Sequence, residues 1–236
     1  MKFKTSISKV GEDDLIIRNE KLSSLMKGKF TDSVFLLLSG RKAKEVESKL
    51  FESMLISVID HGMGVASSLT SRFVMSTGNS LNTAVGAGVL ALGDLHGGAI
   101  ENSMKQLLSV KDVEEFVSSC VDNKQVIFGF GHKHYKEDPR AKRIVKLCKE
   151  LNFTSKYLDI ALQIEKVLEK KKGKKICLNV DGVIAAVLLE MGFSPEIGKG
   201  FFIIGRTPGL VAHAVEEKLT EKPVRRVDEK DIEYLG

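Results

Sequence analysis

Five histidines supply the side chains best suited to acid–base chemistry in this sequence, and three of them lie beside glycines. His61 occurs in Ile-Asp-His-Gly, His96 in Gly-Asp-Leu-His-Gly-Gly and His132 in Gly-Phe-Gly-His. Imidazole titrates near neutrality and can donate or accept a proton, and glycine lets a ligand approach the backbone closely. The three together indicate acid–base work at a carbonyl group, although a structural role stays open for each one alone.

One carboxylate and two arginines add to this set. Asp181 lies in Leu-Asn-Val-Asp-Gly, and its apolar neighbours predict a raised pKa and a role as acid or base. Arg140 follows Asp-Pro and Arg206 follows Ile-Gly, and a guanidinium can bind a carboxylate at two points. The alternatives are a helix N-cap for the aspartate and surface ion pairs for the arginines.

Two other kinds of site are disfavoured by the spacing. His132 and His134 form His-x-His, but no cysteine or acidic pair nearby completes a metal shell, so we expect no metal. Gly129-Phe-Gly131 is a fragment of a dinucleotide-binding loop, and the position of its third glycine is taken by His134. The sequence also contains no Gly-Lys-Ser/Thr phosphate loop.

The composition is that of a globular protein with a mild positive charge. Of 236 residues, 43% are hydrophobic and 28% charged, and the formal net charge is +5. This surplus suits an anionic ligand without demanding nucleic acid. Tryptophan is absent, and the lysine-rich run at 170–175 has no nucleic-acid-binding motif beside it, so we interpret it as a solvated helix end.

Cysteine usage and hydropathy indicate a reduced, cytoplasmic protein. The N-terminus has no apolar signal region, and no stretch reaches the roughly 18 apolar residues of a membrane span. An odd number of widely spaced cysteines predicts buried, reduced thiols rather than disulfides or a zinc site, at Cys120, Cys148 and Cys177.

The periodicity of apolar residues predicts an all-α fold, mostly helical, with a small N-terminal β hairpin. Alternation over 3–9 and 14–18 predicts the hairpin. An apolar run from Val34 stops at Gly40, and Asp138-Pro139 predicts a capped helix start. Helical spacing predicts further helices at 43–60, 64–76, 81–92, 97–109, 112–122, 139–151, 154–172, 176–191 and 208–219.

Four motifs in the same order give the chain a resemblance to the citrate synthase superfamily over nearly its whole length. They are Asp60-His-Gly, Leu95-His-Gly-Gly-Ala followed by Glu101, Gly129-Phe-Gly-His with Asp138-Pro-Arg, and Asn179-Val-Asp-Gly. The segment from Gly205 to His213 is similar to the last active-site helix of the family. Only 60 residues precede His61, and this compact form resembles citryl-CoA lyases and the citrate-synthase-like C-terminal module of ATP-citrate lyase.

The resemblance implies roles for these residues. His96, His132 and Asp181 would be catalytic, with His96 on the thioester oxygen, His132 on the hydroxyl or carbonyl oxygen of the oxaloacetate part, and Asp181 as the acid or base at carbon. Substrate carboxylates would bind to His61, Arg140, Arg206 and, from a neighbouring subunit, Arg226, with Arg225 as the alternative. Coenzyme A would bind at Val126, Ile127, Phe128, Gly129, Gly131, Lys133, Lys136 and Asn179.

The implied activity is that of a citryl-CoA lyase, which cleaves citryl-CoA to acetyl-CoA and oxaloacetate without a metal or other cofactor. A short citrate synthase is the alternative, followed by a non-catalytic CoA-binding subunit. The family architecture implies a large helical dimerisation domain of 1–96 plus 193–236, and a small closing domain of 97–192. A homodimer or homotetramer is expected, and a separate ATP-dependent enzyme that forms citryl-CoA stays open.

Overall fold

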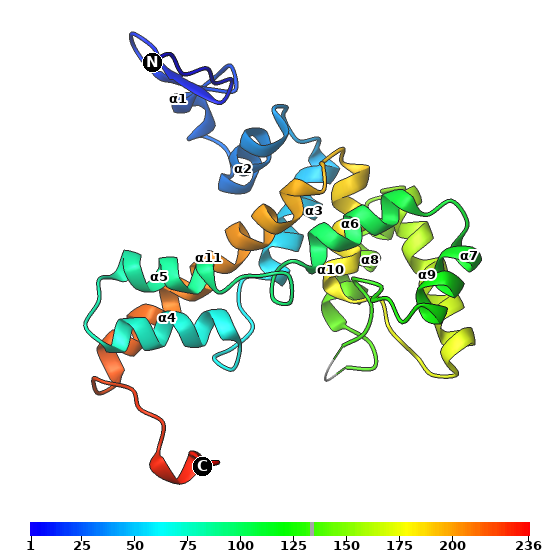
Figure 1. Cartoon of the computed structure of the whole chain (residues 1–236). Coiled ribbons are helices and arrows are strands. Elements are labelled where there is room, and N and C mark those ends of the chain that lie inside the picture. The colour runs from blue at the N-terminus through cyan, green and yellow to red at the C-terminus, as the bar shows by residue number, and fades with distance from the viewer. Residues whose placement is uncertain (133–134) are drawn as a thin grey trace. The chain divides into compact units, whose positions relative to one another are not determined.

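The computed structural model describes residues 1–132 and 135–236, and most of them are helical (Figure 1). This confirms the predicted all-α class with a small N-terminal sheet. Within the described residues, no helix has the length and apolar character needed to cross a membrane. The helices are α1 (Leu22–Leu25), α2 (Phe30–Ser39), α3 (Glu45–Ser57), α4 (Ala66–Ser76), α5 (Leu81–Leu90), α6 (Ala99–Ser109), α7 (Val113–Asp122), α8 (Pro139–Glu150), α9 (Lys156–Lys172), α10 (Val180–Glu190) and α11 (Glu196–Thr220).

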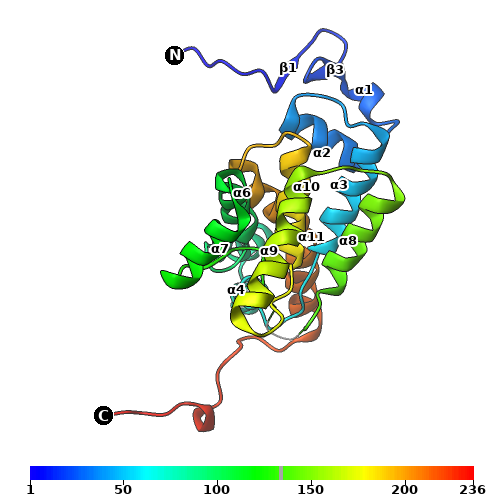
Figure 2. The same cartoon turned by 90° about the vertical axis from the view of Figure 1, so that its right-hand side faces the viewer.

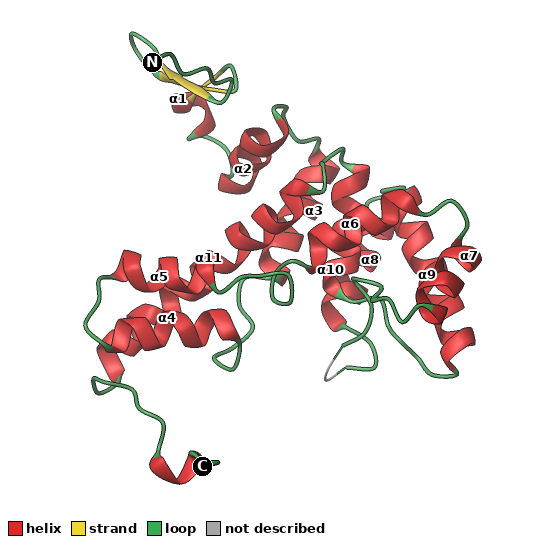
Figure 3. Cartoon of the chain, viewed as in Figure 1, coloured by secondary structure: helices red, strands yellow, loops and turns green. Residues whose placement is uncertain are grey.

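The N-terminal sheet has three antiparallel strands rather than the predicted two (Figure 3). They are β1 (Ser8–Val10), β2 (Leu15–Ile17) and β3 (Glu20–Lys21), in that order. The first strand is shorter than the predicted 3–9. The third strand was missed because Arg18 and Asn19, both at positive φ (46° and 68°), form a tight turn with few of the usual turn residues.

The chain divides into two compact units, which are described separately below. Unit 1 comprises Met1–Ser57 and Ala99–Lys199, and unit 2 comprises Val58–Gly98 and Gly200–Gly236. The domain boundaries predicted from the family resemblance have similar breaks near residues 97 and 193, but they place residues 1–57 with the other part. The roles of those domains, dimerisation and closure, stay predictions.

The core of unit 1 surrounds α10. This helix is apolar on all sides, and every residue from Gly182 to Leu189 is buried, as expected of a helix with neighbours all round. It packs against α6, α8 and α9 (Figure 2). The neighbouring α9 buries one stripe, Leu158, Ala161, Ile164 and Leu168, and ends in three lysines before Gly173, which has a left-handed φ of 62°.

Two helix starts differ from the sequence prediction. The helix predicted at 176–191 begins at Val180, because residues 177–179 are extended and bonded to the loop before His132. The helix predicted at 208–219 begins twelve residues earlier, at Glu196, and Pro208 lies inside it. Proline favours the first helical turn, so it suggested a start; here the helix instead continues through it, without the Pro208 N–H.

Unit 2 is built from α4, α5 and the part of α11 from Gly200 onwards. Helices α4 and α5 pack side by side, and a small apolar cluster contains Met75, Ala84 and Ala214. Charged groups are also buried in this unit, since Arg72 is 4% and Glu217 1% exposed. The interior of unit 2 is therefore held by ion pairs as well as by apolar packing.

A close backbone approach in unit 1 joins Gly129 to Gly182. A Cβ on Gly182 would lie 2.5 Å from the carbonyl oxygen of Gly129, and a Cβ on Gly129 would lie 2.5 Å from Cα of Gly182. Gly129 also has a positive φ of 86°. Both positions therefore require glycine, for steric reasons on each side and for the backbone conformation at Gly129.

We predict that Gly182→Ala destabilises the fold although alanine is the better helix former. The forced shift of the loop should cost about 2 kcal/mol net in the free energy of unfolding. Gly86→Ala in α5 is the matched control, because its Cβ would meet no atom within 4 Å. This variant should be neutral or gain about 0.5–1 kcal/mol. Urea unfolding at one protein concentration measures both, and equal stability of the two variants would contradict the steric argument.

Candidate active site

The predicted site residues fall into two groups, one in each unit. His132, Arg140 and Asp181 belong to unit 1, and His61, His96, Arg206 and Arg226 belong to unit 2. Each group is built from the residues of its own unit.

In unit 1, the loop that leads to His132 is bonded to the segment that leads to Asp181. Phe130 and Leu178 form an isolated antiparallel bridge. The Gly131 amide donates to the Cys177 carbonyl at 2.7 Å, and the Asn179 amide donates to the Gly129 carbonyl at 2.9 Å. These bonds fix the backbone next to His132 against the start of α10.

Asn179 is the N-cap of α10, so the alternative interpretation of Asp181 as the N-cap is wrong. The Asn179 side-chain oxygen accepts from the amides of Asp181 and Gly182, at 3.0 and 3.2 Å. Its side-chain amide donates to the Gly131 carbonyl at 2.9 Å. Asp181 lies half-buried in the first turn of α10.

Asp138 organises the other side of this group. Its buried carboxylate accepts from Nε and Nη2 of Arg140 at 3.0 Å each, and from the Val180 amide at 2.9 Å. Burial alone would raise the pKa of Asp138, but the bonds from Arg140 and Val180 outweigh it and hold the pKa below the usual 3.8. Arg140 is thus a half-buried, oriented cation rather than a surface ion pair, with its side chain 25% exposed.

The ring of His132 contacts both Tyr135 and Arg140. Nδ1 accepts from the Tyr135 amide at 3.1 Å, and Nη2 of Arg140 lies 3.5 Å from Nε2. A neutral ring that accepts at Nδ1 carries its proton on Nε2. Arginine can only donate, so a bond from Arg140 needs Nε2 without a proton, whereas the bond from the Tyr135 amide needs Nδ1 without one. A neutral His132 ring therefore makes one of these two bonds at a time, and its proton can lie on either nitrogen.

In unit 2, His96 is held by a buried serine. Nε2 of His96 lies 2.9 Å from Oγ of Ser67, which is fully buried. Burial lowers the pKa of His96 below its usual 6.5, and the positive charges of Arg206 and His61 lower it further. His96 is therefore neutral at neutral pH, and if the Ser67 hydroxyl donates to Nε2, the ring proton is on Nδ1.

Arg206 is buried, which makes the surface ion-pair alternative wrong for this residue as well. It is 3% exposed, its Nε donates to the Val58 carbonyl at 2.9 Å, and its guanidinium lies 4.8 Å from the centre of the Phe202 ring. His61 is exposed in the adjoining loop. Both Arg206 and His61 lower the pKa of His96, so the neutral imidazole lies within the electrostatic influence of these two groups.

The segment proposed for coenzyme A lies beside a hollow of about 390 Å³ between α7 and α9. Gln106 holds this segment, because its side chain donates to the Val126 carbonyl and accepts from the Phe128 amide, both at 2.8 Å. Lys136 is exposed, and Lys133 lies outside the described residues. The hollow is lined by Cys120, Val121, Lys124, Gln125, Val126, Ile127, Phe130, Leu168, Lys172 and Ile176.

The two candidate arginines near the C-terminus differ in their surroundings. Arg225 is bonded to Glu217 at 2.6 and 2.7 Å, whereas Arg226 is exposed. This difference favours Arg226 as the residue available to a neighbouring subunit.

The three cysteines are free and buried, as predicted, and burial raises the pKa of Cys148 to about 11.

Sequence reasoning missed Ser67, Gln106 and the second role of Asp138. The Asp-Pro pair correctly predicted that Asp138 caps α8, through its bond to the Arg140 amide at 3.0 Å. Its bond to Val180 joins residues 42 positions apart, which a local pattern does not reveal. Among the described residues, no three His, Cys, Asp or Glu side chains form a candidate metal site.

A family model described as "Citrate synthase, C-terminal domain" matches residues 17–227. The chain is 33% identical to "Citrate synthase 2" of Bacillus subtilis over 196 residues, which cover 80% of this chain and 52% of the relative. It is 30% identical to a "Probable ATP-citrate synthase" of Dictyostelium discoideum, over 94% of this chain and 39% of the relative. The chain thus spans about half or less of the length of these relatives.

Solved structures match over the whole chain. The citryl-CoA lyase of Hydrogenobacter thermophilus superposes with a TM-score of 0.95 and 45% identity, covering 99% of this chain and 94% of that one. The ATP citrate lyase of Methanothrix soehngenii, solved with citrate and coenzyme A, gives a TM-score of 0.91 and 25% identity. That match covers all of this chain and 42% of the other.

We predict that Asp138→Asn lowers the free energy of unfolding by about 2–3 kcal/mol at pH 7, because charged bonds to Arg140 and Val180 are weakened. The lowered pKa of Asp138 means that its stabilisation is present above pH 3.8 and is lost as the pH falls through the folded-state pKa. The stability difference between wild type and variant should therefore be constant from pH 5 to 7 and shrink below about pH 3.8.

Asp112→Asn is the matched control for this prediction. Asp112 is the exposed N-cap of α7 and accepts from the Glu115 amide at 2.8 Å. Asparagine caps a helix about as well as aspartate, so this variant should change stability by less than about 0.5 kcal/mol. Urea unfolding at each pH measures both variants, and an equal loss in both would show that Asp138 acts as a cap alone.

Proposed function

The chain belongs to the citrate synthase family, and from this premise we propose that it is a citryl-CoA lyase. The reaction cleaves the carbon–carbon bond of citryl-CoA and yields acetyl-CoA and oxaloacetate. The match to the Hydrogenobacter citryl-CoA lyase carries the proposal, because it spans nearly the full length of both chains at 45% identity. The ATP citrate lyase solved with citrate and coenzyme A supports the class of substrate.

Cleavage begins at the hydroxyl group of the citryl part, where His132 acts. Loss of the hydroxyl proton lets the oxygen form the carbonyl of oxaloacetate as the carbon–carbon bond breaks. To take this proton at Nε2, the ring must carry its own proton on Nδ1 and so release the Tyr135 amide. With that amide bonded, Nε2–H instead donates to the carbonyl oxygen of oxaloacetate. Both states keep the ring beside Arg140.

The electron pair of the broken bond moves onto the thioester oxygen, so that the enol of acetyl-CoA forms as its enolate, hydrogen-bonded at that oxygen. His96 stabilises this oxygen as a neutral donor, and its lowered pKa supports that role. Asp181 then gives a proton to the methylene carbon to form acetyl-CoA, so a proton is taken from oxygen and one is returned to carbon. No metal or redox cofactor takes part in the proposed sequence.

The remaining groups bind the anionic ends of the substrate. Arg140, Arg206 and His61 bind the carboxylates of the oxaloacetate part, as oriented or buried cations do well. The hollow beside Val126 and Ile127 suits the adenine part of coenzyme A, since most of its lining residues are apolar and Lys124 and Lys172 lie at its wall. Lys133 and Lys136 remain candidates for the phosphates.

A citrate synthase is the second candidate, favoured by the 33% identity to the Bacillus protein. It would condense acetyl-CoA with oxaloacetate and hydrolyse the thioester. A lyase instead needs a supply of citryl-CoA, so the proposal includes a separate ATP-dependent enzyme that forms this thioester. A non-catalytic CoA-binding subunit is less well supported, because His96, His132 and Asp181 are all present.

One assay separates these functions. Purified protein is given citryl-CoA, oxaloacetate is followed with a coupled dehydrogenase, and free thiol is measured in parallel. A lyase releases oxaloacetate without free coenzyme A. Release of free coenzyme A from acetyl-CoA and oxaloacetate would identify a synthase, and neither product would contradict both enzymatic proposals.

We predict that Asp181→Asn lowers the turnover number about 10²–10⁴-fold, as expected for loss of a positioned acid or base. The fold should be retained, because the cap of α10 is Asn179 and not Asp181. Asp159→Asn, also in the first turn of a helix (α9), is the matched control and should keep its activity. Near-normal turnover of a folded Asp181→Asn protein would exclude Asp181 from the chemistry.

The apolar surface of unit 2 supports a homo-oligomer. Leu90 is 87%, Leu219 76% and Phe73 42% exposed. These side chains come from α5, α11 and α4, and Leu69, Val211 and Val215 on two of the same helices are also more than a third exposed. Solvent-facing apolar side chains at this density are typical of surfaces that another protein covers. We propose that this other protein is a second copy of the chain, which would also lend its Arg226.

We predict that two damaged chains restore activity when mixed. Asp181→Asn and Arg226→Ala chains should each be weakly active, and random exchange between dimers would leave about one quarter of the sites intact. Activity measured after exchange should rise toward that fraction. Two Asp181→Asn chains, one of them tagged, serve as the exchange control. A monomer in sedimentation, or proven exchange without recovery, would refute the shared site.

A further inference from the structure

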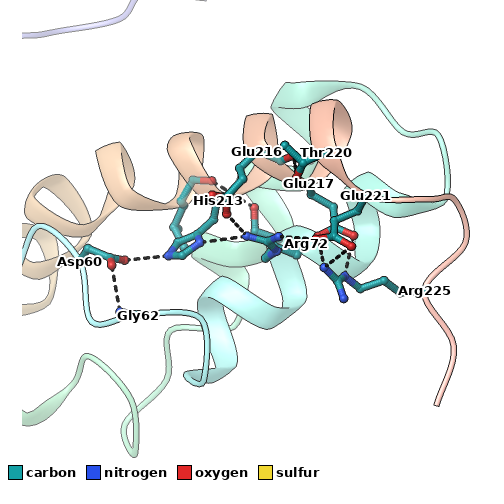
Figure 4. Close-up of polar contacts among 11 residues, drawn as sticks. Asp60, Gly62, Arg72, His213, Glu216, Glu217, Thr220, Glu221 and Arg225 are labelled. Atoms are coloured by element: carbon teal, nitrogen blue, oxygen red, sulfur yellow. Dashed lines mark hydrogen bonds and ion pairs between the residues drawn. The ribbon is translucent and has the colours of Figure 1, made fainter. Parts of the chain in front are cut away.

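A connected series of charged side chains in unit 2 begins at the loop of His61. The Asp60 carboxylate accepts from the Gly62 amide at 2.9 Å through one oxygen, and lies 3.1 Å from Nε2 of His213 through the other (Figure 4). Asp60 therefore connects the residue that follows His61 to α11. Burial raises the pKa of Asp60, but the hydrogen bonds from the amides of Gly62 and His61 and the contact with His213 outweigh it and lower the pKa overall.

The loop is placed for this contact by a glycine on α11. A Cβ on Gly209 would lie 2.5 Å from the Ile59 carbonyl and 3.0 Å from Oδ1 of Asp60. Gly209 is one helical turn before His213, so both face the same segment. The segment at 59–60 thus lies directly against the helix backbone, which puts the Asp60 carboxylate within reach of the imidazole.

His213 connects Asp60 to a buried arginine. Nη1 of Arg72 lies 3.4 Å from Nδ1 of His213, and arginine can act there solely as a donor. His213 therefore accepts at Nδ1 and donates from Nε2 to Asp60. This orientation uses both ring nitrogens, and the side chain of His213 is 16% exposed.

Arg72 and Glu217 form the buried centre of this series of side chains. Nε of Arg72 lies 2.7 Å from Glu217, and the two side chains are 4% and 0% exposed. Arg72 also bonds to Glu216. A buried ion pair of this kind tolerates little displacement, because separating the partners leaves an uncompensated charge.

Arg225, at the far end of this series of side chains, holds the C-terminal segment. Nε and Nη2 of Arg225 lie 2.6 and 2.7 Å from the Glu217 carboxylate, and the Arg225 amide donates to Oγ of Ser76 at 3.3 Å. Arg226 is the next residue. One buried carboxylate thus bonds both to the arginine that contacts His213 and to the neighbour of Arg226.

We propose that Asp60, His213, Arg72, Glu217 and Arg225 form one positioning network that holds the loop of His61 and the segment of Arg226 in place for binding substrate carboxylates. This inference rests on the proposed function, in which His61 and Arg226 bind those carboxylates. The five residues are positioning residues, since none of them is assigned a contact with substrate. None of the roles proposed above requires them.

His213→Ala tests the network directly. Hydrogen exchange of the amides at 60–64 should become about tenfold faster or more, and the Kd for oxaloacetate should rise about tenfold, while the Kd for coenzyme A stays unchanged. His213→Gln retains a donor that can reach Asp60 and should recover most of both losses. Lys218→Ala, at an exposed position on the same helix, is the matched control and should behave as wild type.

Glu217→Gln tests whether the two ends share one anchor. In the folded variant, hydrogen exchange of the backbone amides should become faster both at 60–64 and at 223–227. A response at 223–227 alone would show two separate contacts and would overturn the single network. If this variant does not fold, His213→Ala decides, and unchanged exchange and oxaloacetate affinity in that variant would overturn the proposal.

The exchange measurement needs no substrate, so it separates this proposal from the proposed function. If wild type neither binds oxaloacetate nor cleaves citryl-CoA, the proposed function fails, and with it the role in carboxylate binding, whatever the exchange data show. If wild type cleaves citryl-CoA while His213→Ala matches it in exchange and affinity, the network alone fails.

Discussion

The close approach of Gly129 to Gly182 is the constraint on which the unit 1 part of the site depends. Neither residue has room for a Cβ, so the loop before His132 and the first turn of α10 meet backbone to backbone at this point. A contact between backbone atoms leaves no side-chain rotamers to adjust. Three hydrogen bonds between this loop and the segment before α10 add to the contact. His132 and Asp181 consequently extend from a single rigid piece of structure, although 48 residues separate them in sequence.

Buried polar groups perform a similar task for the other candidate residues. Asp138 orients Arg140 and bonds to the start of α10, Ser67 contacts His96, and the Val58 carbonyl accepts from Arg206. Burying such groups is unfavourable unless their bonds are made, so each arrangement has one well-satisfied geometry and poor alternatives. The buried polar groups thus fix side-chain positions that apolar packing alone would leave less well defined.

The sequence predicted the helices and the reactive residues better than it predicted their supports. Apolar spacing and caps located α8 and α9 closely, because those signals are local. Pro208 misled the prediction of α11, since a helix can continue through proline when tertiary packing compensates for the lost bond. The Asp138–Val180 and Arg72–Glu217 contacts join residues 42 and 145 positions apart, and no periodic pattern encodes such pairings.

The electrostatics around His96 connect binding to chemistry. Its pKa is lowered by burial and by the charges of Arg206 and His61, which are the groups proposed to bind carboxylates. A bound carboxylate would offset those charges, and the pKa of His96 would move back toward its usual 6.5. The free protein would thus keep His96 neutral with its N–H as a hydrogen-bond donor, and bound substrate would make the ring easier to protonate. Since an enol oxygen gains negative charge as the carbon–carbon bond breaks, the stabilisation would increase when the substrate is in place and the charge develops.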